Sequence, residues 1–227
     1  MGSIDEWFYD AFKLNVASHG RPLSSLAFFL FKRMGLISKF KLNEARLARF
    51  LLRVEDGYPD NPYHNRTHAA DVLRTTHIFL TRGGVLKAVS DAAVHKASQP
   101  TNPGSVSGSQ VIMTSSSNIV SQDPNAGHRE AAFMSKLLSC YVAAVAHDHE
   151  HQGLTNDFLI RSGADLAMRY NDMSPHEMHH VSSTCILLND EQYNFFPPVK
   201  NNALKETVRR DLIDLILATD MKQVRVS

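Results

Sequence analysis

The sequence predicts an all-α fold. Apolar residues recur at the three- and four-residue spacing of helices, and Asn, Ser, Gly and Pro stand where such segments begin or end. No run alternates between apolar and polar residues for long enough to indicate a β-strand. The chain is therefore expected to form a multi-helix bundle.

The N-terminal part of the chain contains four predicted helices, and the first is indicated by the near-helical spacing of Trp7, Phe8, Phe12 and Leu14. Pro22 marks the start of a helix that continues over residues 23–34, because proline is well suited to a first helical turn. Asn43 is expected to cap the next helix through its side-chain oxygen. A cluster of Gly, Pro, Asp and Asn at 57–62 then precedes a helix expected over 65–79, which ends at a Gly-Gly pair.

The middle of the chain differs in composition. Residues Ala97–Gly127 are rich in Ser, Gly, Asn, Gln and Pro and contain few large apolar side chains. Such a segment buries too little surface to offset the entropy of ordering it, so we expect a flexible insertion. A helix is predicted to follow over 129–146, and its alanines near the end allow neighbouring helices to approach closely.

Three further helices are predicted in the C-terminal part. Asn156 is expected to cap a helix over 157–170. Ser174 and Glu177 have the spacing of a capping box, which predicts a helix that runs to about residue 188. An amphipathic pattern predicts the last helix over 203–221.

Composition excludes several classes of function. The formal net charge is +1, so nothing indicates binding to nucleic acid or to an acidic membrane surface. The apolar run at 26–31 is too short to cross a bilayer, and no membrane segment is predicted. Cys140 and Cys185 lie within apolar helical patterns, which favours buried thiols and a reducing, intracellular compartment.

Histidines are the residues that indicate chemistry. His147 and Asp148 follow directly after an apolar helix, and His64 and His68 are four residues apart, so they share a helix face. Imidazole nitrogen suits zinc, and carboxylate oxygen also suits magnesium. Alone, His64 and His68 would be read as histidines bonded to backbone at a helix start. Together with His147 and Asp148, they predict a metal site.

Three motifs carry a resemblance to a known family. They are YHNRTHAADV at 63–72, HDHEHQG at 147–153 and YNDMSPHEMHH at 170–180. In this order they resemble the catalytic domain of the class I cyclic nucleotide phosphodiesterases, which belong to the HD superfamily. The likeness extends from about Glu6 to Gln223.

The resemblance implies hydrolysis of the 3′,5′-cyclic nucleotides cAMP or cGMP to 5′-monophosphates, with two divalent ions, Zn²⁺ and Mg²⁺ or Mn²⁺. Asp148 would bridge the two ions. By resemblance, His64 is the general acid for the O3′ leaving group, and the metal ligands are His68, His147 and Asp148. The groups that orient water and ligands are His151, Glu177 and His180, and the substrate pocket contains Tyr63 and Asn156. His77, His149, Glu150 and His176 are outside this set; His77 is expected to be structural and the other three exposed.

The sequence also departs from the family pattern. Gln152 and Val224 stand where the family has Pro and His, and family domains continue beyond the length of this chain. That further length supplies a second Asp ligand, a purine-binding Gln and a stacking Phe. We therefore expect a partial catalytic domain of a larger cytoplasmic protein, truncated at the C-terminus, with weak metal binding and little hydrolysis. The alternatives are a metal-binding or regulatory fragment, and another phosphohydrolase of the HD type.

The composition of Ala97–Gly127 yields a testable prediction. Limited proteolysis of the 227-residue chain should cut first within this segment, because segments of linker composition are preferred cleavage sites. Mass spectrometry of the early fragments locates the cut. If this segment resists protease as long as the predicted helices do, it is not a flexible insertion.

Overall fold

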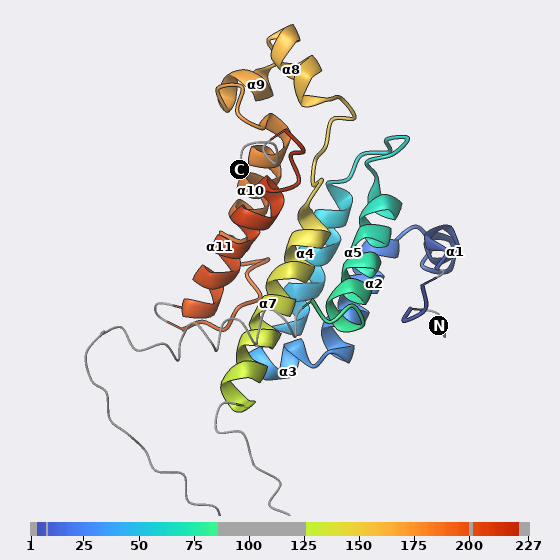
Figure 1. Ribbon diagram of the computed structural model, residues 1–227, viewed down its shortest axis with the longest axis vertical. Helices are drawn as coiled ribbons and strands as arrows, with labels where there is room; N and C mark the ends of the chain where they lie inside the picture. Colours follow the sequence, from blue (N-terminus) through green and yellow to red (C-terminus); the bar gives the residue numbers. More distant parts are fainter. Residues whose placement is uncertain (1–3, 8, 86–125, 200–201, 223–227) are drawn as a thin grey trace, which may run out of the picture.

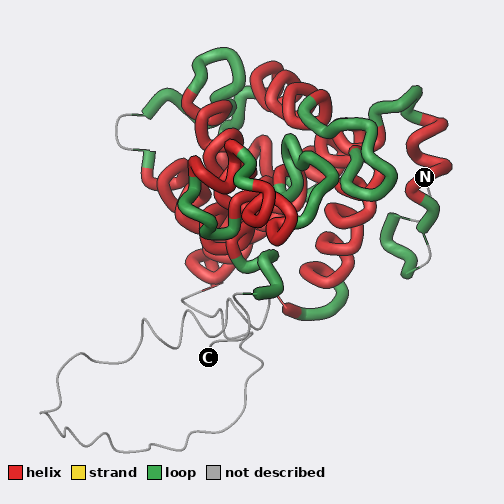
Figure 2. Tube along the Cα trace, turned by 90° about the horizontal axis from the view of Figure 1, so that it is seen from above, coloured by secondary structure: helices red, strands yellow, loops and turns green. Residues whose placement is uncertain are grey.

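A computed structural model describes residues 4–7, 9–85, 126–199 and 202–222. These residues form ten helices and contain no strand, which confirms the all-α prediction (Figures 1 and 2). The helices are α1 (Ala11–Ala17), α2 (Pro22–Arg33), α3 (Leu36–Phe40), α4 (Glu44–Asp56), α5 (Arg66–Thr81), α7 (Ala126–Ala146), α8 (Asn156–Ser162), α9 (Asp165–Arg169), α10 (Pro175–Asn189) and α11 (Ala203–Leu217).

Helix α7 lies at the centre of the bundle. It contacts α2, α4, α5, α10 and α11, and Figure 1 shows it between the α10–α11 pair and the N-terminal helices. Leu137, Leu138, Tyr141, Val142 and Val145 on α7 are completely buried. Because these side chains are covered by neighbouring helices, the C-terminal end of α7 is held within the bundle, where it can present His147 and Asp148.

Several predicted helix starts are confirmed by their caps. Pro22 is the first residue of α2, and Asn43 caps α4 by accepting a hydrogen bond from the backbone N–H of Arg46 at 3.0 Å. Asn65 caps α5 by accepting from the N–H groups of Thr67 and His68, at 2.9 and 3.1 Å. The cap therefore fixes the turn of α5 that carries His68.

Other boundaries differ from those predicted. Thr155 caps α8, and Asn156 is the first residue of that helix instead of its cap. The helix expected over 157–170 is divided, because Gly163 adopts a left-handed conformation that ends α8 before α9 begins. The last helix ends at Leu217 instead of at residue 221.

The predicted capping box at Ser174 is wrong. Ser174 precedes α10 but has a φ of 39°, and its side chain makes no capping hydrogen bond. Its hydroxyl instead donates to the Oδ2 atom of Asp220 at 2.6 Å, which joins the start of α10 to the turn after α11. The predicted insertion at 97–127 lies outside the described residues, except that Ala126 and Gly127 begin α7.

Glu55 is a completely buried carboxylate near the end of α4. It accepts hydrogen bonds from the N–H of Leu23 at 2.8 Å and from the hydroxyl of Ser24 at 2.5 Å. Both donors belong to the first turn of α2, where backbone N–H groups have no partner within the helix. Arg21 lies 3.8 Å from the same carboxylate. Glu55 therefore joins two helices of the bundle.

Replacement of Glu55 tests this joint. Glu55→Ala leaves the Leu23 N–H and the Ser24 hydroxyl buried without their acceptor, so we expect a loss of about 1–3 kcal/mol in the free energy of unfolding. The matched control is Asp56→Ala, because Asp56 is adjacent, exposed and bound to Arg21 at the surface. The loss in the free energy of unfolding for Asp56→Ala should stay below about 1 kcal/mol. Urea denaturation measures both, and equal losses would contradict a special role for Glu55.

Candidate metal centre

Two segments far apart in the sequence meet at the end of α7. His68 lies in the first turn of α5, and His147 and Asp148 follow the last residue of α7. The Oδ2 atom of Asp148 lies 3.4 Å from Nε2 of His68 and 3.1 Å from Nε2 of His147. One ligand atom from each of the three residues lies within 4.8 Å of the other two. The predicted ligands are therefore brought together.

The donor set fits a divalent ion. Nδ1 of His147 is 2.9 Å from the carbonyl oxygen of Ala144, which can only accept, so Nδ1 carries the proton. The lone pair on Nε2 then faces Asp148 and is available to a metal. A backbone carbonyl that fixes the tautomer in this way is common for metal-binding histidines. Two imidazoles and one carboxylate are ligands that zinc accepts.

The electrostatics favour an ionised carboxylate. Burial acts to raise the pKa of Asp148, but the imidazoles of His147 and His68 beside it outweigh that effect. The pKa of Asp148 is therefore held well below its usual range. An anionic carboxylate next to two imidazoles provides the negative charge that a divalent ion requires.

Asn61 joins the two loops that border the centre. Its Nδ2 atom donates to the carbonyl oxygens of His64, at 3.2 Å, and of His151, at 2.9 Å. Gly153 lies against the Asn61 side chain, where an added Cβ would be 2.9 Å from Oδ1, and its φ is 76°. Both facts require a glycine at this position. The loop before α5 and the loop after α7 are thus fixed to each other.

Tyr58 holds the end of α7 from the other side. Its side chain is buried, and its hydroxyl donates to the carbonyl oxygen of Val145 at 2.9 Å. The hydroxyl oxygen of Tyr58 in turn accepts a hydrogen bond from the backbone N–H of Asp148 at 3.3 Å. One phenol therefore satisfies two backbone groups where the helix ends, and it fixes the backbone from which the carboxylate of Asp148 extends.

His64 lies beside the centre without joining the ligand triad. It forms a separate group with Asp148 and His151, in which the ligand atoms are within 4.8 Å of one another. Its ring stacks on that of His151, with centroids 3.9 Å apart and planes 17° apart. Partial burial lowers the pKa of His64, which makes its protonated form a stronger acid. This position is compatible with proton transfer next to bound metal.

The remaining predicted residues surround the centre. His180 is buried, and its Nε2 is 4.0 Å from Oδ1 of Asp148. Nδ2 of Asn156 donates to Oε2 of Glu177 at 2.8 Å. Burial raises the pKa of Glu177. Tyr63 is 63% exposed, and its ring lies against those of His64 and His68.

A cavity of about 650 Å³ opens on the α1 side of the centre. Tyr63 and His68 form part of its wall, and residues at the start of α1 form the opposite part. The cavity gives a small molecule a route to His68. Its lining residues are Tyr9, Asp10, Ala11, Phe12, Pro62, Tyr63, Asn65, Thr67, His68 and Asp71.

Three residues expected to be exposed are not. His149 and His176 are 0% and 2% exposed, and Glu150 is partly buried and accepts a hydrogen bond from Nε2 of His179 at 2.9 Å. Nδ1 of His149 donates to the carbonyl oxygen of Val54 at 3.1 Å. Burial lowers the pKa of His149 to about 4. His77 is structural as expected, because its Nδ1 lies 2.5 Å from the Tyr141 hydroxyl.

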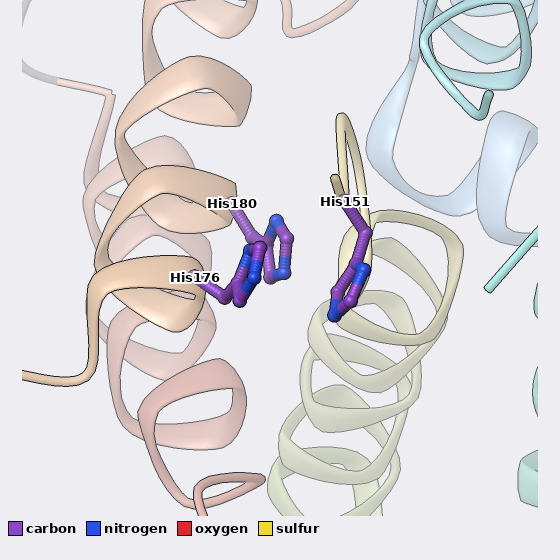
Figure 3. Close-up of side chains that lie close together, drawn as sticks. All are labelled: His151, His176 and His180. Atoms are coloured by element: carbon purple, nitrogen blue, oxygen red, sulfur yellow. The ribbon is translucent and has the colours of Figure 1, made fainter. Parts of the chain in front are cut away.

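His176 is the residue that the sequence reasoning missed. With His151 and His180 it forms a buried cluster of three imidazoles (Figure 3). The signal was present, because His176 and His180 are four residues apart and so share one face of α10. Burial is also the main reason that the pKa of His151 falls to about 4, and the neighbouring His176 and His64 add to this effect.

Comparison with known proteins gives a consistent result. The 3′5′-cyclic nucleotide phosphodiesterase family matches residues 120–225. A human dual specificity calcium/calmodulin-dependent 3′,5′-cyclic nucleotide phosphodiesterase 1B is 34% identical over 96% of this chain. The Drosophila melanogaster dual specificity calcium/calmodulin-dependent enzyme 1 and the mouse high affinity cAMP-specific and IBMX-insensitive 3′,5′-cyclic phosphodiesterase 8A are each 31% identical over the same share.

Solved structures agree with the sequences. The crystal structure of the phosphodiesterase domain of the RhoPDE fusion protein from the choanoflagellate Salpingoeca rosetta matches with a TM-score of 0.69 and 27% identity. A second structure of the phosphodiesterase domain of rhodopsin phosphodiesterase from the same organism gives 0.70 and 26%. Both matches cover 98% of this chain and 55% and 53% of the solved chains, respectively.

These similarities point to one class of protein, because every relative named above is a cyclic nucleotide phosphodiesterase or a phosphodiesterase domain. The chain is similar to the 3′,5′-cyclic nucleotide phosphodiesterase family and to the phosphodiesterase domains of solved structures. It spans 33% of the human relative and 21% of the fly and mouse relatives, which are larger proteins. Among the described helices, none has the length and apolar character needed to cross a bilayer.

The packing of Gly57 against the centre yields a prediction. A Cβ at Gly57 would lie 2.0 Å from the ring of His149, so Gly57→Ala must displace that ring. We expect a loss of about 1–3 kcal/mol in the free energy of unfolding. Gly127→Ala is the control, because nothing lies near its added Cβ, and its effect should stay below about 1 kcal/mol. If urea denaturation gives similar losses for Gly57→Ala and Gly127→Ala, the ring of His149 moves without a cost in stability.

Proposed function

We propose that this protein hydrolyses 3′,5′-cyclic nucleotides, cAMP or cGMP, to 5′-nucleoside monophosphates, by a mechanism that uses two divalent ions. The observation that carries the proposal is the convergence of His68 with His147 and Asp148, with His64 alongside. The similarity to cyclic nucleotide phosphodiesterases supports the reaction class. The chain would then form part of a catalytic domain, with an insertion at 97–127, in a cytoplasmic protein of cyclic nucleotide signalling.

The ligand residues would hold the ions as follows. His68, His147 and Asp148 would bind the tighter ion, Zn²⁺, because two nitrogen donors favour zinc. Asp148 has a second carboxylate oxygen, which would face the other ion, Mg²⁺ or Mn²⁺. When bound, the two ions would supply an activated water and would neutralise charge on the phosphoryl oxygens.

His64 would act as the general acid. The departing O3′ alkoxide needs a proton, and His64 lies close to Asp148 but outside the ligand triad, so its ring remains available to substrate. Face-to-face contact with His151 limits rotation of the His64 ring. Burial favours loss of the proton from the His64 imidazolium. Each of these contacts supports delivery of a proton at one fixed position.

The surrounding polar residues would position water and substrate. Glu177 is partly buried and accepts a hydrogen bond from Asn156, and His180 is buried and donates to the carbonyl oxygen of His149. His151 accepts the N–H of Gly153 at 2.9 Å. Tyr63 at the mouth of the centre would contact the nucleotide. None of these residues distinguishes adenine from guanine.

Two substitutions on α5 and its preceding loop test the assignment. In the protein that carries this sequence, His64→Asn should retain zinc and lower turnover of cAMP and cGMP by about 10²–10⁴-fold, the usual range for loss of a general acid. His68→Asn should lose both zinc and turnover, since it removes a ligand. Zinc content is measured by elemental analysis, and 5′-nucleotide formation by chromatography.

The outcomes separate the alternatives. Equal zinc loss in the two variants would contradict separate roles for His64 and His68. Wild-type protein that binds zinc but converts neither nucleotide, with Mg²⁺ or Mn²⁺ added, would favour a metal-binding or regulatory protein over an enzyme. The solved phosphodiesterase domains are almost twice as long as this chain, which is the reason to include that outcome.

A further inference from the structure

The histidine cluster behind the metal centre is built from two segments. His176 and His180 lie on α10, and His151 lies in the loop after α7 (Figure 3). Their side chains are 2%, 1% and 7% exposed, respectively. One ring nitrogen from each lies within 4.8 Å of the other two. The function proposed above uses His151 and His180 but assigns nothing to His176.

The outer hydrogen bonds fix two of the three tautomers. Nε2 of His176 lies 3.0 Å from the carbonyl oxygen of Leu154, and Nδ1 of His180 lies 2.6 Å from that of His149. Carbonyl oxygens only accept, so these two nitrogens carry the protons. The lone pairs are then on Nδ1 of His176 and Nε2 of His180. Metal-binding histidines are commonly oriented by such outer contacts.

One of these lone pairs has no partner. Nδ1 of His176 is buried and, within the described part of the chain, accepts no hydrogen bond. Buried polar atoms in native proteins almost always have a partner, which can be a protein group, a water or an ion. Nε2 of His180 lies 4.0 Å from Oδ1 of Asp148, which is longer than a hydrogen bond. One buried nitrogen without a partner thus lies on the same face of α10 as Nε2 of His180.

We propose that His151, His176 and His180 form a metal site separate from the two-ion centre proposed above, which binds a transition ion of the Zn²⁺ class through imidazole nitrogens. His176 and His180 are four residues apart, which is the spacing at which two histidines on one face of a helix can bind the same metal ion. Nitrogen donors without a carboxylate favour zinc and related ions over Mg²⁺ or Ca²⁺, which prefer oxygen. This donor set shares no residue with His68, His147 and Asp148.

His151 completes the site after a local rearrangement. Its ring now stacks on that of His176, with centroids 4.0 Å apart and planes 8° apart, and its Nδ1 accepts the N–H of Gly153. The lone pair of an imidazole nitrogen lies in the plane of its ring, so lone pairs of two parallel rings do not point to the same ion. The His151 ring must therefore turn to bind an ion held by His176 and His180. This rotation gives up the hydrogen bond from the N–H of Gly153. The planes of His176 and His180 are themselves 18° apart, so one of these rings must also turn for both lone pairs to reach one ion.

The zinc content of the 227-residue chain tests the proposal. The metal-free chain is loaded with Zn²⁺, excess zinc is removed, and bound zinc per chain is measured together with its affinity against a chromophoric chelator. His176→Leu should bind about one molar equivalent less than wild type, because it removes one of three ligands. His179→Leu is the matched control on the same helix and should bind as much as wild type, since His179 lies outside the cluster.

Two results would overturn the proposal. One is an equal zinc content in wild type and His176→Leu, and the other is an equal loss in His176→Leu and His179→Leu. Circular dichroism checks that each variant folds, and His176→Gln replaces His176→Leu if the leucine variant does not. Bound zinc is counted without substrate, so the result does not depend on whether the protein hydrolyses cyclic nucleotides. A retained second equivalent in His68→Asn would further support two separate sites.

Discussion

The contact between α5 and α7 is the constraint on which the metal centre depends. His68 belongs to one helix and His147 and Asp148 to the end of the other, so their side chains meet only if the helices pack in one register. Small buried residues lie on both helices, among them Ala69 and Ala70 on α5 and Ala143 and Ala146 at the end of α7. The hydrogen bond between His77 and Tyr141 adds a polar contact that fixes this register.

Much of the fold could be predicted because its signals are local. Apolar periodicity and the capping residue Asn43 are read within one helical turn, and the structure agrees with them. The predicted capping box at Ser174 failed because of a contact distant in sequence. Ser174 had the right spacing for a capping box, but its hydroxyl bonds to Asp220, 46 residues later, and no local pattern encodes that choice. Gly163 was a local signal for the end of a helix that could have been used.

The candidate site divides in the same way. The motifs that contain His68, His147 and Asp148 carry the family pattern, and the structure places these residues together as predicted. Burial of His149 and His176 depends on which helices cover them, and the residues next to them in sequence do not determine that. His149 is buried because Gly57 leaves room for its ring, and His176 because α10 packs toward the loop that contains Leu154. Such partners become visible only when the chain is folded.

The side chain of Asn61 has a consequence for how this region can evolve. A single amide binds the backbone of the loop before α5 and that of the loop after α7, while Gly153 makes space for it. Neither loop can change its length or its path alone without losing one of these bonds. Divergence of the two loops should therefore be correlated among relatives, with insertions in one accompanied by compensating changes in the other, although 90 residues separate Asn61 from His151.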